Sequence, residues 1–261
     1  MTTYETIRTA RDGDVLTITL DRPERLNAAP PQMFDEIGDA LDGLSGARAV
    51  LITGEGRAFC SGADLAARGE RTGAPGDAAF TALTTSYNPT MLKLSRLPVP
   101  IVSAINGPAA GIGCSLALAA DFALIGTNAY LLQAFVNIGL VPDGGASWML
   151  ARLVGKARAT EMMLLGERIH GPKAAEWGLV HKCVDDAMLL HEAHALAARL
   201  AAGPTMAIGL MRQGLAEALD GDYAAAMQRE AENQRTAGSS IDAAEGGLSF
   251  LEKRKPAFQG K

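Results

Sequence analysis

Residues 100–115, with the sequence PIVSAINGPAAGIGCS, join an apolar run to a glycine-rich segment. The run 101–105 is typical of a buried strand, and the glycines after it predict a turn that opens a helix. Backbone N–H groups at a helix start have no intrahelical acceptor, and Gly107, Gly111 and Gly113 have no side chain to keep a substrate away. The segment therefore predicts a site that stabilises negative charge on a substrate oxygen.

Other glycine-dependent sites have different spacings. The three glycines do not form the G-x-G-x-x-G pattern of dinucleotide sites. Gly155-Lys156-Ala157 lacks the earlier glycine and the Ser or Thr of a P-loop, and no G-x-S-x-G nucleophile elbow is present. A purely structural interpretation stays open, in which these glycines let a helix pack closely on its strand.

Composition predicts a globular protein. The chain has 261 residues, of which 48% are hydrophobic and 20% charged, so one large domain or a main domain with a smaller C-terminal region is expected. We place the core at 1–200 and the C-terminal helical region at 201–261. A net charge of −5 argues against nucleic acid as a partner. No membrane-length apolar run and no signal pattern are found, which predicts a cytoplasmic protein.

Cysteine and histidine usage predicts no metal site. The three cysteines, Cys60, Cys114 and Cys183, are far apart in apolar surroundings and are expected to be reduced thiols of the core. Of the four histidines, only His191 and His194 are spaced to meet on one helix face, without a third ligand nearby.

Periodicity predicts an α/β core followed by helices. Segments 4–9 and 15–20 alternate apolar and polar residues around a turn at 11–14, which predicts a hairpin. Short apolar runs are separated by helical stretches, the pattern of β-α units; the predicted strands are 49–53, 101–105 and 122–125, and the predicted helices are 30–44 and 78–97. The composition of residues 66–77 predicts a loop. Beyond residue 185 the pattern is helical, which predicts a cap on the core or an oligomer interface.

A second loop of small residues, 58–65 with the sequence AFCSGADL, also follows a predicted strand. An oxyanion hole needs two donors that converge on one oxygen from different directions. Loops after neighbouring parallel strands supply that geometry. The two loops together predict one site.

Ordered motifs along nearly the whole chain resemble the crotonase superfamily of enoyl-CoA hydratases and isomerases. They are DRPERLNA at 21–28, the loops 57–65 and 105–116, GLVPDGG at 139–145, and FLEKRKP at 250–256. The resemblance implies a β-β-α spiral core with a helical C-terminal region. It also implies a homotrimer or a dimer of trimers formed through residues 201–261.

The same resemblance implies an acyl-CoA thioester as the substrate. Its carbonyl oxygen would be held by the backbone N–H groups of Ala63 and Ile112. The other substrate-binding residues that it implies are Arg25, Asp64, Leu65, Gly111, Phe135, Phe250 and Lys253, the last two from the same or a neighbouring subunit. The basic run 253–255 also has the simpler interpretation of a solvated helix end. CoA is then part of the substrate, and no metal or organic cofactor is expected.

Two positions depart from the hydratase pattern. Hydratases of this superfamily use two glutamates, at positions that correspond here to Ser115 and Phe135. Neither side chain is a carboxylate, so the two-glutamate hydration mechanism is not expected. Asp143 occupies the position of the single acid/base carboxylate in the isomerase branch that includes the phenylacetate-pathway epoxyphenylacetyl-CoA isomerase. The resemblance therefore favours an isomerase in which Asp143 moves the proton.

Three alternatives stay open. Pro-Asp-Gly-Gly before a helix is also typical of an N-cap, so Asp143 has a structural interpretation as well. A hydratase with weaker water activation is the second enzymatic interpretation, and a non-catalytic acyl-CoA-binding protein is the interpretation from another class. The acyl group is not readable, although helix 78–97, with Phe80, Leu83 and Tyr87, is expected to shape its pocket.

Overall fold

A six-stranded sheet forms the centre of the protein in the computed structural model, which describes residues 3–65 and 74–261. The strand order is β1-β2-β3-β4-β6-β9, with β1 antiparallel to β2 and every later neighbour parallel. The strands are β1 (Ile7–Asp12), β2 (Val15–Leu20), β3 (Ala49–Gly54), β4 (Ile101–Ile105), β6 (Phe122–Gly126) and β9 (Lys182–Val184). The three predicted strands are confirmed. The predicted hairpin also forms, but its first strand is 7–12 and not 4–9, because Arg11 and Asp12 pair with β2 where a turn at 11–14 was expected.

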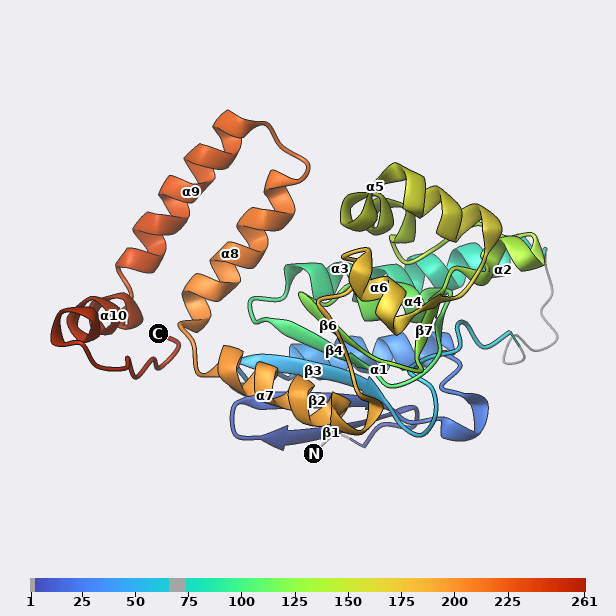
Figure 1. The fold of residues 1–261 in the computed structure, drawn as a ribbon, viewed down its shortest axis with the longest axis horizontal. Helices are drawn as coiled ribbons and strands as arrows, with labels where there is room; N and C mark the ends of the chain where they lie inside the picture. The colour runs from blue at the N-terminus through green and yellow to red at the C-terminus, as the bar shows by residue number, and fades with distance from the viewer. Residues whose placement is uncertain (1–2, 66–73) are drawn as a thin grey trace.

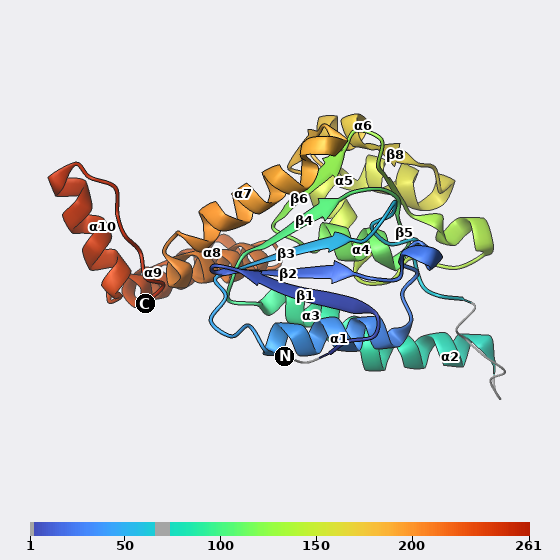
Figure 2. The same ribbon diagram turned by 90° about the horizontal axis from the view of Figure 1, so that it is seen from below.

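Helices cover both faces of this sheet (Figure 2). One face packs against α1 (Pro31–Asp42) and α3 (Asn88–Arg96) in the larger hydrophobic core. The other packs against α7 (Leu189–Ala201) in a smaller core cluster that includes Leu124 and Ala193. Strands β3 and β4 are buried along their whole length because both of their faces are covered, which explains their continuous apolar sequences.

A second, three-stranded sheet lies beyond the carboxyl end of β4. Its order is β5-β7-β8, formed by β5 (Ala109–Ala110), β7 (Tyr130–Leu132) and β8 (Ile169–His170). The other elements of the core are η1 (Pro23–Arg25), α4 (Ile112–Leu118), η4 (Ala134–Ile138), α5 (Ala146–Leu165), α6 (Gly171–Glu176) and η5 (Asp186–Met188). The chain thus repeats strands and helices in the expected spiral.

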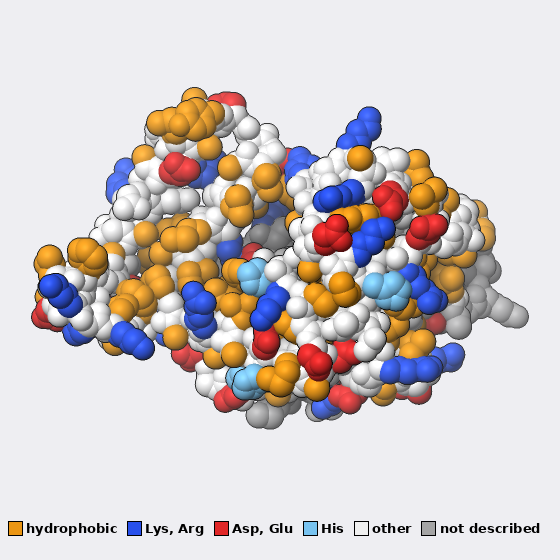
Figure 3. All heavy atoms as spheres, viewed as in Figure 1, with side chains coloured by type: hydrophobic (Ala, Val, Ile, Leu, Met, Phe, Trp, Pro, Cys, Tyr) orange, Lys and Arg blue, Asp and Glu red, His pale blue; other side chains and the backbone are white. Residues whose placement is uncertain are grey.

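Three helices form an arm that extends from the core: α8 (Thr205–Ala218), α9 (Tyr223–Gly238) and α10 (Ile241–Glu252) (Figure 1). Hydrophobic side chains gather over the arm in Figure 3, and Phe250 is 83% exposed. The chain end folds back on α10, because buried Asp242 accepts hydrogen bonds from the N–H groups of Gln259 and Gly260 at 2.6 and 2.8 Å. The division of the chain at residue 200 and the assembly role of 201–261 stay predictions.

The segment before α3 differs from the prediction. Helix α2 (Pro75–Ala82) begins three residues earlier than expected, with Pro75 at its first position, where a missing N–H costs nothing. A π-helical segment, Leu83–Tyr87, then joins it to α3. Most of the predicted loop 66–77, residues 66–73, lies outside the described residues.

Two of the cysteines are deeply buried. Burial raises the pKa of the Cys60 and Cys114 thiols to about 12, whereas Cys183 is partly exposed. Because the thiolate is the nucleophile, we expect a chromogenic disulfide reagent to titrate no more than one thiol in the native protein and all three after denaturation. Rapid reaction of two or three thiols in the native protein would contradict this packing.

Within residues 3–65 and 74–261, no helix is long and apolar enough to cross a membrane. The same residues contain no cluster of three or more His, Cys, Asp or Glu side chains suited to a metal ion.

Candidate active site

The glycine-rich turn ends at the start of α4, where the first backbone N–H groups of the helix have no intrahelical acceptor. Gly111 has φ 53° and ψ −126°, a conformation available essentially to glycine alone, and its N–H donates to Leu132 O at 2.9 Å. The first helical bond at this end runs from Ser115 N–H to Gly111 O at 3.1 Å. Within the described residues, no backbone acceptor faces the N–H groups of Ile112, Gly113 and Cys114, as is usual for the first turn of a helix.

The second loop pairs directly with this turn. Cys60 N–H donates to Pro108 O at 3.0 Å, and Ala110 N–H donates to Cys60 O at 2.9 Å. A Cβ atom on Gly113 would lie 2.6 Å from the Cys60 Cβ, so only glycine allows the two loops to approach this closely. The sequence-based expectation that these loops form one site is consistent with this pairing.

The direction of the Ala63 N–H follows from the pairing of Ala63 with Ala29. Ala29 N–H donates to Gly62 O at 2.8 Å, and Asp64 N–H donates to Ala29 O at 2.9 Å, which makes an isolated parallel bridge between Ala29 and Ala63. In such a bridge the bonded groups belong to the residues on either side of Ala63, so its own N–H points away from Ala29. No hydrogen-bond acceptor for it is found within the described part of the chain.

Asp143 lies on a turn that packs on α4. Gly144, with φ 58°, has no room for a side chain, because a Cβ there would overlap Ile112 and lie 2.9 Å from the Ser115 Cβ. The buried Ser115 hydroxyl donates to Asp143 O at 3.0 Å. Ser115 therefore fixes the position of the backbone that carries Asp143.

A pocket of about 160 Å³ connects several predicted site residues. Ala63, Asp64, Phe135 and Asp143 all line it, and the Phe135 ring also packs against Gly111. The other lining residues are mostly apolar: Pro31, Ala78, Ala79, Ala82, Leu83, Tyr87, Leu140, Val141 and Pro142. A carboxylate thus shares a mostly apolar pocket with a residue whose backbone N–H has no protein acceptor among the described residues.

Helix α2 and the π-helical segment supply one wall of this pocket. Leu83 and Tyr87 line it as predicted, and the Tyr87 hydroxyl donates to Ala29 O at 2.8 Å. Phe80 does not line it, because its side chain is 68% exposed. The prediction of a helix over 78–97 did not by itself separate these outward and inward positions.

Asp64 is held by an ion pair. Its carboxylate accepts from the Arg22 guanidinium at 2.8 Å, and the Asp64 and Arg22 side chains are 6% and 20% exposed. Arg22 also donates to Ala28 O, so it connects three neighbouring backbone segments. Arg22 lies in the motif DRPERLNA at 21–28, but the motif did not predict this ion pair.

The remaining predicted residues do not line this pocket, and Gly111 and Ile112 are among them. Arg25 and Leu65 are exposed, and Arg25 belongs to η1. Phe250 and Lys253 are on the arm, at the C-terminal end of α10, and do not line the pocket of their own chain.

Comparisons with known proteins agree on one family. Residues 10–261 match the sequence family described as enoyl-CoA hydratase/isomerase. The chain is 39% identical to the 1,2-epoxyphenylacetyl-CoA isomerase of Escherichia coli K12 over 95% of both chains. It is 42% identical to a protein of Rhodobacter capsulatus named "Probable enoyl-CoA hydratase" over 99% of both. Its fold matches the crystal structure of the enoyl-CoA hydratase of Bacillus anthracis with a TM-score of 0.92, at 29% identity over 98% of this chain and 100% of that one.

Proposed function

Because the chain belongs to the enoyl-CoA hydratase/isomerase family of the crotonase superfamily, we propose that it isomerises an enoyl-CoA thioester through an enolate, with one carboxylate as the proton shuttle. The observation that carries the proposal is the shared pocket. Asp143 and Ala63 line it together, and the loop of Ala63 pairs with the turn that opens α4.

The backbone donors have the charge-stabilising role. The Ala63 N–H and the Ile112 N–H bind the thioester oxygen from two loops. Hydrogen bonds to this oxygen strengthen as negative charge develops on it, so they stabilise the enolate more than the substrate.

Asp143 has the proton-transfer role. Its carboxylate takes a proton from C2 of a 3-enoyl group, the electron pair moves onto the thioester oxygen, and the same carboxyl group returns the proton to C4. The double bond thereby moves into conjugation with the carbonyl. Phe135, Leu140 and Val141 keep the surroundings of this carboxylate apolar.

A hydratase is the second candidate within the family, and the name of the Rhodobacter relative favours it. Ser115 and Phe135 weigh against it, because hydration in the two-glutamate manner needs carboxylates at these positions. The Ser115 hydroxyl is bonded to Asp143 O, which leaves it poorly suited to activate water. A non-catalytic acyl-CoA-binding protein is the candidate from another class.

The arm has the assembly role in this proposal. Its exposed apolar side chains would be covered in a homotrimer or a dimer of trimers. Phe250 and Lys253 would then contact CoA bound to another copy, while Arg25, Asp64 and Leu65 contact CoA from their own chain. CoA arrives with the substrate, no further cofactor takes part, and the protein works in the cytoplasm.

Assays in deuterated water test the proposal. A panel of 3-enoyl-, trans-2-enoyl-, epoxy- and aromatic acyl-CoA thioesters is incubated with the protein and analysed by mass spectrometry. We expect 3-enoyl-CoA to become conjugated and deuterium to enter at C2 and C4. Faster conversion of trans-2-enoyl-CoA to 3-hydroxyacyl-CoA would establish the hydratase instead. Tight binding with neither turnover nor exchange would establish the non-catalytic binder.

A further inference from the structure

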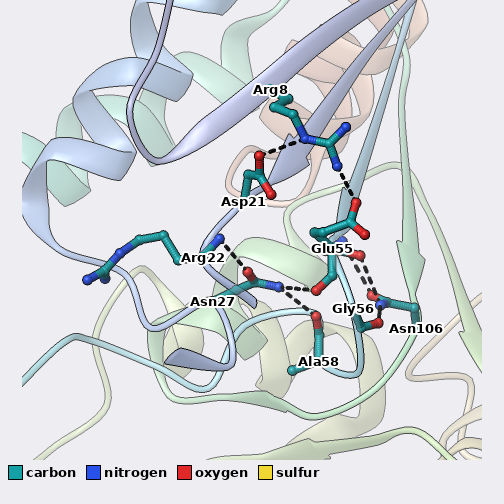
Figure 4. Close-up of polar contacts among 9 residues, drawn as sticks. Arg8, Asp21, Arg22, Asn27, Glu55, Gly56, Ala58 and Asn106 are labelled. Atoms are coloured by element: carbon teal, nitrogen blue, oxygen red, sulfur yellow. Dashed lines mark hydrogen bonds and ion pairs between the residues drawn. The ribbon is translucent and has the colours of Figure 1, made fainter. Parts of the chain in front are cut away.

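Asn27 occupies an unusual position close to the candidate site. Its backbone is left-handed, with φ 54°, and the residue is fully buried. The side-chain oxygen accepts from Arg22 N–H at 2.8 Å, and the side-chain nitrogen donates to Glu55 O at 3.0 Å and Ala58 O at 2.8 Å (Figure 4). The proposed chemistry does not use this buried amide.

The bonds of Asn27 hold the loop that leads to Ala63. Ala58 and Glu55 belong to the segment that connects β3 to this loop, and both are tied to one side chain. The backbone next to Asn27 continues the attachment, because Leu26 O accepts from Ser61 N–H at 3.0 Å. Ala29, two residues after Asn27, then forms the bridge that directs the Ala63 N–H.

Residues 26–29 thus form the backbone segment to which residues 58–64 are hydrogen-bonded. The left-handed conformation at Leu26 and Asn27 turns the chain so that the amide enters the interior while the backbone pairs with the loop. Buried amide groups with all their bonds made resist displacement, since breaking one leaves an unpaired polar group out of water. A side chain remote from the reacting atoms therefore controls where the loop lies.

We infer that Asn27 is the positioning residue for the Ala63 N–H: its three hydrogen bonds set the loop so that this donor points into the pocket. The inference rests on the proposed role of Ala63 as a donor to the thioester oxygen. Displacement of a catalytic group by about 1 Å is enough to cost about 10²-fold in rate. Asn27 acts on the rate through Ala63 and touches no substrate atom.

The test uses Asn27→Gly, which keeps a left-handed backbone accessible and removes all three side-chain bonds. Asn27→Ser is the second variant, in case the glycine variant fails to fold. A para-dialkylamino cinnamoyl-CoA is the spectroscopic probe, because hydrogen bonds to its carbonyl oxygen shift its absorption to longer wavelength. The control for lost stability is Leu124→Ala, a buried residue of the core cluster beneath α7.

We expect the Asn27 variants to lose at least half of the red shift of the bound probe and about 10- to 100-fold in kcat, with less than threefold change in the Kd of the probe. Leu124→Ala should lower the melting temperature and leave the red shift intact. Asn27 variants that fold and keep the full red shift and kcat would overturn the inference alone. A wild-type protein that binds the probe without any red shift would overturn the proposed role of Ala63 itself, and with it the premise for Asn27.

Discussion

Replacing Asp143 with alanine is expected to lower kcat for 3-enoyl-CoA isomerisation by about 10²- to 10⁴-fold, because positioned acid/base groups contribute rate factors of this size. Two carboxylates among the described residues line the pocket, Asp143 and Asp64. The Asp64 carboxylate is paired with the Arg22 guanidinium. The measurement is the rise in absorbance of the conjugated thioester. Deuterium incorporation from solvent should fall in parallel, since the same group starts both processes.

Two further variants separate loss of the Asp143 base from changes in side-chain shape and in backbone position. Asp143→Asn keeps the shape of the side chain and removes its basicity, so it should be as slow as the alanine variant while the KM stays within a few-fold. Ser115→Ala removes the hydroxyl that fastens Asp143 O and should have a much smaller effect on kcat. Activity of Asp143→Ala within a few-fold of wild type would exclude Asp143 as the proton-transfer group. The helix cap expected as its alternative role is not observed, because the N-cap residue of α5 is Gly145.

Exchange of the Ala63 amide for an ester is expected to lower kcat by about 10²- to 10³-fold, the usual cost of losing one oxyanion donor. Incorporation of lactic acid at position 63 replaces the N–H by an oxygen and leaves every side chain unchanged. Asp64 N–H still donates to Ala29 O, whereas the Gly62 carbonyl becomes an ester carbonyl and accepts from Ala29 N–H more weakly, so a control for that second effect is needed.

The matched control is an ester at position 29. There the lost N–H is the one that donates to Gly62 O, so stability should fall and kcat should respond less. The bound cinnamoyl probe provides the second measurement, and its red shift should decrease with the position 63 ester. A position 63 ester with wild-type kcat and red shift would exclude Ala63 as a donor to the substrate.

Local patterns predicted the central sheet well. Alternation at 15–20 and continuous apolar runs at 101–105 report directly on which faces of a strand are covered, and these strands formed as predicted. The start of α2 was missed although Pro75 is a recognised helix-start residue. The π-helical turn before α3 was not predictable in the same way, because the buried Tyr87 bonds to Ala29, 58 residues away.

Long-range pairing explains what the sequence did not reveal about the site. The glycine turn, Ala63 and Asp143 were found from motifs and resemblance. The bridge between Ala29 and Ala63, the Arg22–Asp64 ion pair and the Asn27 bonds to Glu55 O and Ala58 O were not, since each joins segments more than 25 residues apart. Such contacts leave no periodic signal in the chain. They are also the contacts that hold the loop 58–65 against residues 22–29.

The contact between Gly144 and Ser115 bears on how this site could be altered by evolution or by protein engineering. The Asp143 turn fills the space beside position 115, and the Ser115 hydroxyl supports that turn. A glutamate introduced at position 115 would remove the support and compete for the same space. Placing glutamates at positions 115 and 135 would therefore need the turn at 143–145 rebuilt as well, so the two-glutamate pattern is several changes away from this sequence rather than one.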